Sequence, residues 1–134
     1  MEEKFNYNCS LESFFTEYLR LKLPYINAVL SHIHGSDTRL NDNPLKVLAQ
    51  LLFYNNRYKD LSEKARWKMV FDYDTKQEIC KELRMPPSHL NSYLSQLRRL
   101  KIVKGRKIDE FYVIYPRDEV QLTFNLKVSM DEAE

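Results

Sequence analysis

The chain has 134 residues, of which 43% are hydrophobic and 30% are charged, and its formal net charge is +2. These values are typical of one soluble globular domain, and they exclude a disordered or fibrous chain. No apolar run reaches the roughly 18 residues of a membrane span, and the acidic start MEEKFNYNCS is not a secretory signal. Two distant cysteines, Cys9 and Cys80, indicate reduced thiols rather than a disulfide framework. We therefore expect a cytoplasmic protein with no membrane partner.

Residues 1–43 are predicted to form a helical extension. SLESFFTEYLRLKL suits a helix with Ser10 as its N-cap, although the last six residues of this stretch alternate like a strand. PYINAVLSHIHG then repeats apolar residues at helical spacing, with Pro24 in a first turn and Gly35 at the C-cap. The polar stretch GSDTRLNDN is expected to be a loop.

Residues 44–56 show the clearest helical pattern in the chain. Pro44 suits a first helical position, and Asp42 or Asn43 can cap the helix. The apolar positions that repeat at i, i+3, i+4, i+7 and i+8 are Leu45, Leu48, Ala49, Leu52 and Phe53. A charged connector containing a helical turn, SEKAR, follows, and then MVFDY, residues 69–73, which is predicted to be a strand.

Residues 75–100 are predicted to be two helices separated by a stiff break. Thr75 and Glu78 have the spacing of a capping box, and Met85-Pro86-Pro87 ends the first helix because proline lacks an amide donor. Ser88 is expected to cap the second helix, whose buried stripe comprises Leu90, Tyr93, Leu94, Leu97 and Leu100. Its opposite face carries His89, Asn91, Ser92, Ser95, Gln96, Arg98 and Arg99.

The C-terminal third is predicted to be mainly strand. Lys101–Lys104 and Phe111–Tyr115 are expected to pair across a turn at Gly105, and VQLTFNLKV, residues 120–128, alternates apolar and polar residues throughout. Charge is unevenly distributed: residues 76–107 hold nine Lys or Arg and two acidic residues, a net +7, against −5 elsewhere. A basic block in an acidic chain is typical of a surface that binds a polyanion.

The order helix, strand, helix, tight turn, helix, strand, basic turn and strand resembles the winged helix-turn-helix family over about residues 44–116. The segments that carry the resemblance are PLKVLAQLLFYNN, MVFDY, TKQEICKELRM-PP-SHLNSYLSQLRRL and IVKGRKIDEFYVIYP. The Met-Pro-Pro turn departs from the small residue or glycine common in the family, and the connector at 57–68 is longer than in many members. The chain also resembles small winged-helix proteins encoded by bacteriophages. The resemblance implies an α+β fold, with residues 1–43 as an N-terminal extension and residues 117–134 as a C-terminal strand and acidic tail.

The resemblance and the basic block together predict a non-enzymatic, sequence-dependent duplex DNA-binding protein that regulates transcription or replication. The residues expected to meet base edges are His89, Asn91, Ser92, Ser95 and Gln96, because a recognition helix offers such positions to the major groove. Those expected to meet phosphates or the minor groove are Arg98, Arg99, Lys104, Arg106 and Lys107. We expect a homo-dimer or a higher oligomer, located in the host cytoplasm if the protein is phage-encoded.

A second hypothesis is a protein-assembly module, such as a structural or adaptor component of a phage virion that contacts other virion proteins. The long alternating strand can add to another sheet, and Tyr54, Tyr58 and Trp67 are candidate anchors for a partner. No catalytic motif, cofactor loop or paired-cysteine metal motif is present, so we predict neither an enzyme nor a cofactor nor a metal. His32 and His34 lie two residues apart, a spacing that points their rings in different directions on a helix.

Overall fold

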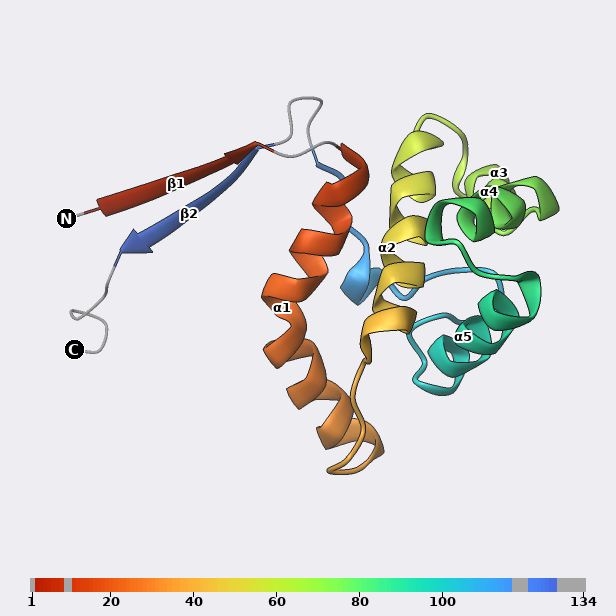
Figure 1. Cartoon of the computed structure of the whole chain (residues 1–134), viewed down its shortest axis with the longest axis horizontal. Coiled ribbons are helices and arrows are strands. Elements are labelled where there is room, and N and C mark those ends of the chain that lie inside the picture. Colours follow the sequence, from red (N-terminus) through yellow and green to blue (C-terminus); the bar gives the residue numbers. More distant parts are fainter. Residues whose placement is uncertain (1, 9–10, 117–120, 128–134) are drawn as a thin grey trace.

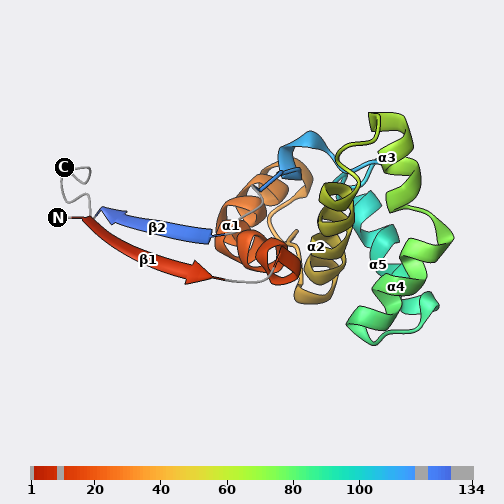
Figure 2. The same cartoon turned by 90° about the horizontal axis from the view of Figure 1, so that it is seen from above.

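A computed structural model of the chain describes residues 2–8, 11–116 and 121–127. Five α-helices make up most of residues 11–116, and two strands from opposite ends of the chain form a separate ribbon (Figures 1 and 2). The elements in chain order are β1 (Glu2–Asn8), α1 (Leu11–His34), α2 (Asp42–Arg57), α3 (Glu63–Val70), α4 (Tyr73–Leu83), α5 (Pro87–Arg99), a short 3₁₀-helix (Glu110–Tyr112) and β2 (Gln121–Lys127).

The core forms around α2, which packs against α1, α3, α4 and α5. Because α2 is covered on several sides, apolar residues occupy most of its circumference rather than one stripe. Leu48 and Leu52 are fully buried, and so are Ile79 of α4 and Leu97 of α5. Cys80 is also buried, and burial raises the pKa of its thiol, which makes it a structural rather than a reactive cysteine.

Helix α1 is continuous through Pro24, where the sequence suggested the start of a separate helix. An interior proline removes one backbone hydrogen bond and costs about 3 kcal/mol relative to alanine. The buried residues Leu19, Ile26 and Leu30 lie on both sides of the proline at helical spacing, so packing on α2 offsets this cost. Gly35 ends the helix with φ of 125°, as predicted. The proposed cap, Ser10, lies outside the described residues.

Residues 69–73 form no strand, so that expectation is wrong. Met69 and Val70 complete α3, which Ser62 caps by accepting the Ala65 amide at 3.3 Å. The Thr75 hydroxyl, expected to cap a helix, is instead buried and donates to the Met69 carbonyl at 2.7 Å. Asp72 is the N-cap of α4. Aromatic and β-branched residues favour strands only where a sheet is available to accept them.

The break between α4 and α5 lies at Met85-Pro86-Pro87, as predicted, but the caps differ from those expected. Helix α4 ends at Leu83 with Arg84 in the left-handed region, at φ of 54°. Helix α5 begins at Pro87, with extended Pro86 as its N-cap, so Ser88 already lies inside the helix. The turn therefore fixes the position of α5 with two prolines and one left-handed residue.

The α+β winged-helix fold class is contradicted, because the part of the structure between residues 11 and 116 contains no strand. The expected wing is reduced to one isolated bridge between Val103 and Ile108, closed by the Lys104 amide donating to the Lys107 carbonyl at 2.8 Å. Phe111 and Tyr112 belong to the 3₁₀-helix rather than to a second wing strand. Ile102, Val103 and Ile108 are buried, so their side chains pack in the hydrophobic core and do not form part of a sheet.

Strands β1 and β2 pair antiparallel over seven residues each, from Glu2 opposite Lys127 to Asn8 opposite Gln121. Strand β2 falls within the alternating stretch 120–128. The ribbon leaves the helices beside the start of α1 and extends away from them (Figures 1 and 2). It brings the first and last described segments of the chain side by side, and it takes no part in the helical core.

Tyr112 is expected to make the protein sensitive to alkali. Burial, together with the nearby negative charge of Asp109, raises the pKa of Tyr112 to about 12, from an ordinary value of 10.0. The neutral phenol is therefore favoured in the fold, and its stabilising contribution is complete below pH 10 and is lost as the pH rises towards 12. We expect wild type to lose on the order of 2 kcal/mol more unfolding free energy than Tyr112→Phe over this range. Urea unfolding at pH 9 and pH 11.5 measures the difference, and parallel losses in both proteins would contradict it.

Candidate nucleic-acid interface

The outer face of α5 is polar and open to solvent. Leu90, Leu94 and Leu97 bury the inner face against the core. Because a helix turns 100° per residue, the residues between these leucines point outward. His89, Asn91, Ser92, Ser95 and Arg99 are all exposed, and Gln96 is half-buried. The predicted base-reading residues therefore share one helix face, and within the described part of the chain no hydrogen bond occupies their side chains.

Contacts with α2 hold α5 in place beneath this polar face. Tyr93 is half-buried, and its hydroxyl accepts a hydrogen bond from the Asn43 side-chain amide at 3.0 Å. Asn43 lies in the first turn of α2, so the middle of α5 is tied to the start of α2. At the other end, the His34 ring lies 3.0 Å from the Leu100 carbonyl and so connects α1 to the residue that follows α5. Helix α5 is thus bonded to α2 near its middle, and the residue after it is bonded to α1.

The basic residues around α5 fall into two groups that the sequence does not distinguish. Within the described residues, no ion pair involves the exposed cations Arg84, Arg99, Lys101 and Arg106. These residues lie around α5: Arg84 precedes the helix, Arg99 is in its last turn, and Lys101 and Arg106 follow it. Lys101 adopts φ of 63°, an uncommon conformation for a residue other than glycine, directly after the helix. We name these four residues the open cations.

Three other predicted phosphate contacts are engaged within the fold. Arg98 donates from Nε to the Gly105 carbonyl at 3.2 Å. Lys104 lies 3.4 Å from an Asp109 carboxylate oxygen, and Lys107 lies 3.2 Å from one of Glu63. Arg98 therefore braces the turn after α5, and Lys107 joins that turn to α3. Exposed ion pairs of this kind are weak, so both lysines can exchange their carboxylate for another anion.

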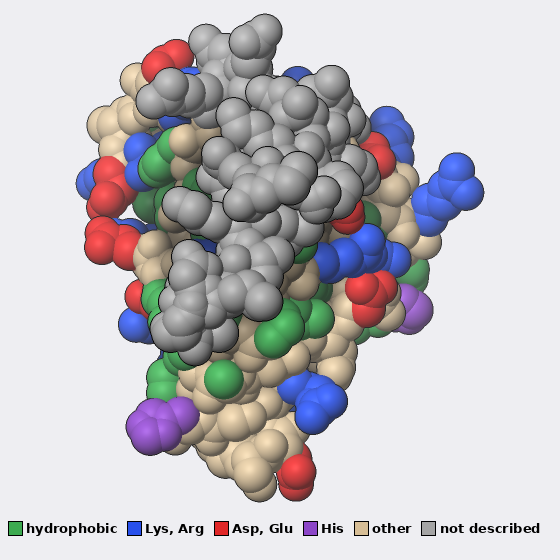
Figure 3. Space-filling model, turned by 90° about the vertical axis from the view of Figure 1, so that its left-hand side faces the viewer, with side chains coloured by type: hydrophobic (Ala, Val, Ile, Leu, Met, Phe, Trp, Pro, Cys, Tyr) green, Lys and Arg blue, Asp and Glu red, His purple; other side chains and the backbone are tan. Residues whose placement is uncertain are grey.

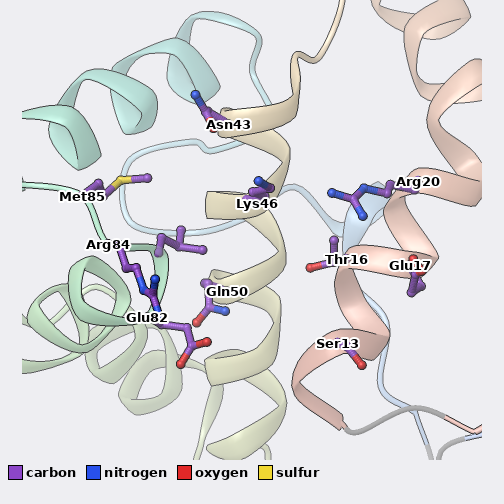
Figure 4. A pocket seen from close by; sticks show the side chains of 11 residues that line it. Ser13, Thr16, Glu17, Arg20, Asn43, Lys46, Gln50, Glu82, Arg84 and Met85 are labelled. Carbon is purple, nitrogen blue, oxygen red and sulfur yellow. The ribbon is translucent and has the colours of Figure 1, made fainter.

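A cleft of about 540 Å³ adjoins the α4–α5 turn (Figure 4). Its floor is one face of α2, with Asn43, Lys46 and Gln50, while α1 and the end of α4 with its turn form the two walls. Arg20 and Lys46 both contact the Asp42 carboxylate, at 3.4 and 3.2 Å. The pKa of Asp42 is lowered, mainly because Lys46 donates a hydrogen bond to it. Two cations thus share one carboxylate at this edge.

The cleft adds three cations to those that the sequence suggested for the interface. Arg20, Lys46 and Arg84 line it beside the turn that leads into α5. Arg20 and Lys46 come from helices α1 and α2, far from the basic block in the sequence, and only the packing of these helices brings them to the turn. No local sequence signal marks either residue. Glu17 and Glu82 also line the cleft, and Arg20 and Lys46 share the Asp42 carboxylate, so the positive charge that stays without an ion pair ahead of α5 is that of Arg84.

Other candidate sites are weaker. His32 and His34 are exposed, and within the described residues no group of three or more His, Cys, Asp or Glu is placed to hold a metal ion. Tyr54 and Trp67 are buried, and Tyr58 is half-buried, so these residues belong mainly to the core rather than to a partner surface. Among the described helices, none has the length and apolar character needed to span a membrane.

The chain was compared with known proteins at three levels. No protein-family model, no curated protein sequence and no solved structure matches it. The resemblance of residues 44–116 to the winged helix-turn-helix family therefore stays a prediction, and the case for function depends on the geometry of α5 and its surroundings.

Proposed function

We propose that the protein binds duplex DNA through the outer face of α5 and acts as a regulator of transcription or replication. One observation carries the proposal: an unoccupied polar helix face is surrounded by the four open cations, Arg84, Arg99, Lys101 and Arg106. An α-helix fits the major groove, where Asn and Gln pair with adenine and Ser contacts several bases. Cations at both ends of such a helix lie where the phosphates that border the groove would pass.

The two sets of residues would contribute differently to binding. The open cations displace counterions from the DNA backbone, which gives affinity without sequence preference. Asn91, Ser92 and Ser95 would then read base edges and supply the preference. Arg98 would act indirectly, because its bond to the Gly105 carbonyl positions the turn that carries Arg106.

A salt titration of binding to random duplex DNA tests the proposal. We expect the logarithm of the binding constant to fall linearly with the logarithm of salt concentration, with a slope of roughly −3.6 to −5.4 for four to six phosphate contacts. Fluorescence anisotropy of a labelled duplex between 50 and 300 mM salt would measure it. A slope near zero, or no binding at 50 mM salt, would rule out DNA as the ligand.

Asn91→Ala is expected to reduce discrimination between sites rather than overall affinity. The substitution removes a bidentate amide from an exposed position and should cost about 1–3 kcal/mol on the preferred sequence. Binding to random duplex DNA should stay within about twofold, because no charge is lost. Selection of bound sites from a random library, followed by anisotropy on the best site, gives both values. Equal losses on the selected and random duplexes would contradict a base-reading role for Asn91.

A protein-assembly module, such as a virion component, is the second candidate function. The observation in its favour is the two-stranded ribbon, which is separate from the helical core and whose strands each leave one edge unpaired within the described residues (Figure 1). Such edges accept strands from other proteins. This candidate predicts stable complexes without DNA, so the salt titration distinguishes it from the first.

A further inference from the structure

We infer that a hollow at the C-terminal end of α5 binds one phosphate group between Arg39 and Arg99, and that in the DNA complex this group is a backbone phosphodiester. The identity of the phosphodiester rests on the proposed DNA-binding function, whereas the phosphate site itself does not. Arg39 lies in the loop between α1 and α2, outside the basic block at residues 76–107. The inference therefore adds a residue from another part of the chain to the interface around α5.

The hollow has a volume of about 230 Å³ and is lined by residues from two separate segments. Gln96 and Arg99 lie three residues apart on one side of α5, Leu100 follows the helix, and Arg39 reaches the hollow from the loop. Among the described residues that line it, none is acidic. Two guanidinium groups and one amide thus border a common space without a carboxylate.

The charges of both arginines are unpaired. Arg39 and Arg99 are exposed, and within the described residues neither side chain takes part in an ion pair or a hydrogen bond. The acidic residues nearest to Arg39 in the sequence are Asp37 and Asp42. Asp42 is already held by two other cations, and Asp37 forms no ion pair with a described residue. Two like charges beside one hollow repel each other, and an anion between them would remove that repulsion.

Much of the surface elsewhere carries mixed charge. On the face shown in Figure 3, basic and acidic side chains lie interspersed. Lysines near α5 follow the same arrangement, since Lys104 and Lys107 each lie beside a carboxylate, at 3.4 and 3.2 Å. The charged residues that line the hollow are instead of one sign, and a concave surface with one sign of charge concentrates ions of the opposite sign.

The backbone on both sides of Arg39 is fixed by hydrogen bonds to α1. The Ser31 hydroxyl donates to the Thr38 carbonyl at 3.2 Å, and the Leu40 amide donates to the Asn27 side-chain oxygen at 2.7 Å. The Leu40 side chain is also buried. Since the loop already has a defined position, an anion has to order only the arginine side chains, which reduces the entropic cost of binding.

A further contact joins this loop to the end of α5. His34 is the last residue of α1, and the loop that carries Arg39 follows it directly. The His34 ring lies 3.0 Å from the carbonyl of Leu100, and the Leu100 amide donates to the Gln96 carbonyl at 3.0 Å. Two of the residues that line the hollow are therefore bonded to each other, and one of them is bonded to the start of the loop. Tertiary contacts bring the two arginines together, whereas their sequence positions are 60 residues apart.

A phosphate group suits this combination of side chains. Guanidinium groups match the oxygens of a phosphate, and two arginines can each bind one of the two free oxygens of a phosphodiester. The Gln96 amide supplies a further N–H donor. Gln96 and Arg99 also belong to the outer face of α5, and a helix in the major groove is bordered by backbone phosphates. The occupant that fits both the chemistry and the position is a phosphodiester of the DNA backbone.

Salt titrations of DNA binding test whether the two arginines share one phosphate. Arg39→Ala is expected to weaken binding to a random duplex by about three- to sixfold at low salt, which is the share of one cation. Because the slope counts neutralised phosphates, Arg39→Ala combined with Arg99→Ala should make the log–log slope less steep by about 0.9, rather than by about 1.8. Anisotropy of a labelled duplex measures both quantities.

The matched control for this titration is Arg57→Ala, which removes an exposed arginine at the opposite end of α2 from the loop. It should change affinity by less than about twofold, because distant surface charges are screened. An Arg39→Ala variant that binds as wild type does, or a slope change near 1.8 for the double variant, would overturn the shared site.

Titration of the full chain with inorganic phosphate, in the absence of DNA, tests the site itself. In ¹⁵N-labelled protein, the side-chain Nε–H signals of Arg39 and Arg99 should shift together and saturate, relative to sodium chloride at equal ionic strength. The Arg57 signal should not. Failure of either arginine in the hollow to respond would overturn the phosphate site.

The two experiments together separate the inference from the DNA-binding proposal. If phosphate saturates the site but Arg39→Ala leaves duplex affinity unaltered, the site holds a free phosphate group, and the assignment of a phosphodiester is overturned. If phosphate saturates the site but wild type binds no duplex, the DNA-binding proposal fails and the phosphodiester with it, while the phosphate site between the two arginines stands. If wild type binds duplex DNA but phosphate shifts neither arginine, the DNA-binding proposal stands and the inference fails.

Discussion

Replacing the open cations Arg84, Arg99, Lys101 and Arg106 by alanine is expected to weaken binding to every duplex DNA by on the order of 10²- to 10³-fold at low salt. The log–log slope against salt should become about 3–4 units less steep, because each cation that meets a phosphate contributes about 0.9. These four residues are chosen because they lie around α5 and, within the described residues, no ion pair engages them. Anisotropy at several salt concentrations provides both values.

The matched control removes charge from another part of the surface. Lys64 and Lys68 are exposed residues of α3, outside the α5 region. Replacing both by alanine should change affinity by less than about threefold, since long-range charge effects are screened at physiological salt. If removing a charge from α3 reduced DNA affinity as much as removing one around α5, the DNA would not bind at a specific site on the protein. The interface proposed for α5 would then be wrong.

Leu97→Ala is expected to lower the free energy of unfolding by about 2–5 kcal/mol. Leu97 is fully buried where α5 packs on α2, so truncation leaves a cavity among close-packed side chains. The Ile102 and Val103 amides donate to the Leu97 backbone carbonyl at 3.0 and 3.2 Å, and the substitution retains that carbonyl, so the expected loss comes from the side-chain packing. Urea unfolding measures the change. Ser95→Ala, on the exposed face of the same helix, should alter stability by less than about 0.5 kcal/mol.

A loss below about 1 kcal/mol for Leu97→Ala would show that α5 is not anchored through this residue. DNA binding by the folded fraction of Leu97→Ala should stay close to wild type, since Leu97 does not reach the outer face. The substitution thus separates stability from recognition, whereas the variant of the open cations should change recognition and leave stability nearly unaltered.

Helix positions were predictable from the sequence where one periodic pattern dominated. The repeat that begins at Leu45 led directly to α2, and Met85-Pro86-Pro87 correctly marked the break before α5. Strand predictions between residues 69 and 115 were wrong because β propensity is decided by neighbours rather than by the residues themselves. Val103 and Ile108 are β-branched residues that favour strands. In the structure both side chains are buried in the core, and the two residues form only one isolated bridge.

The candidate interface was predictable only along α5 itself. Helical periodicity was sufficient to place Asn91, Ser92 and Ser95 on one outward face. It was not sufficient to show that Lys104 and Lys107 are paired with carboxylates, since those pairs depend on how the turn folds and where α3 lies. Arg20 and Lys46 were missed for the same reason: their place beside the turn is a property of tertiary packing.

The pairing of β1 with β2 has a consequence for the order of folding. Glu2 and Lys127 are partners at nearly opposite ends of the chain, so closing the loop between them has a large entropic cost if the helices are still unfolded. Once the helices have packed, the two ends are already near each other and most of that cost has been met. On a ribosome, β1 is made before all five helices and β2 after them, so β1 stays without its partner strand while the whole helical core is synthesised.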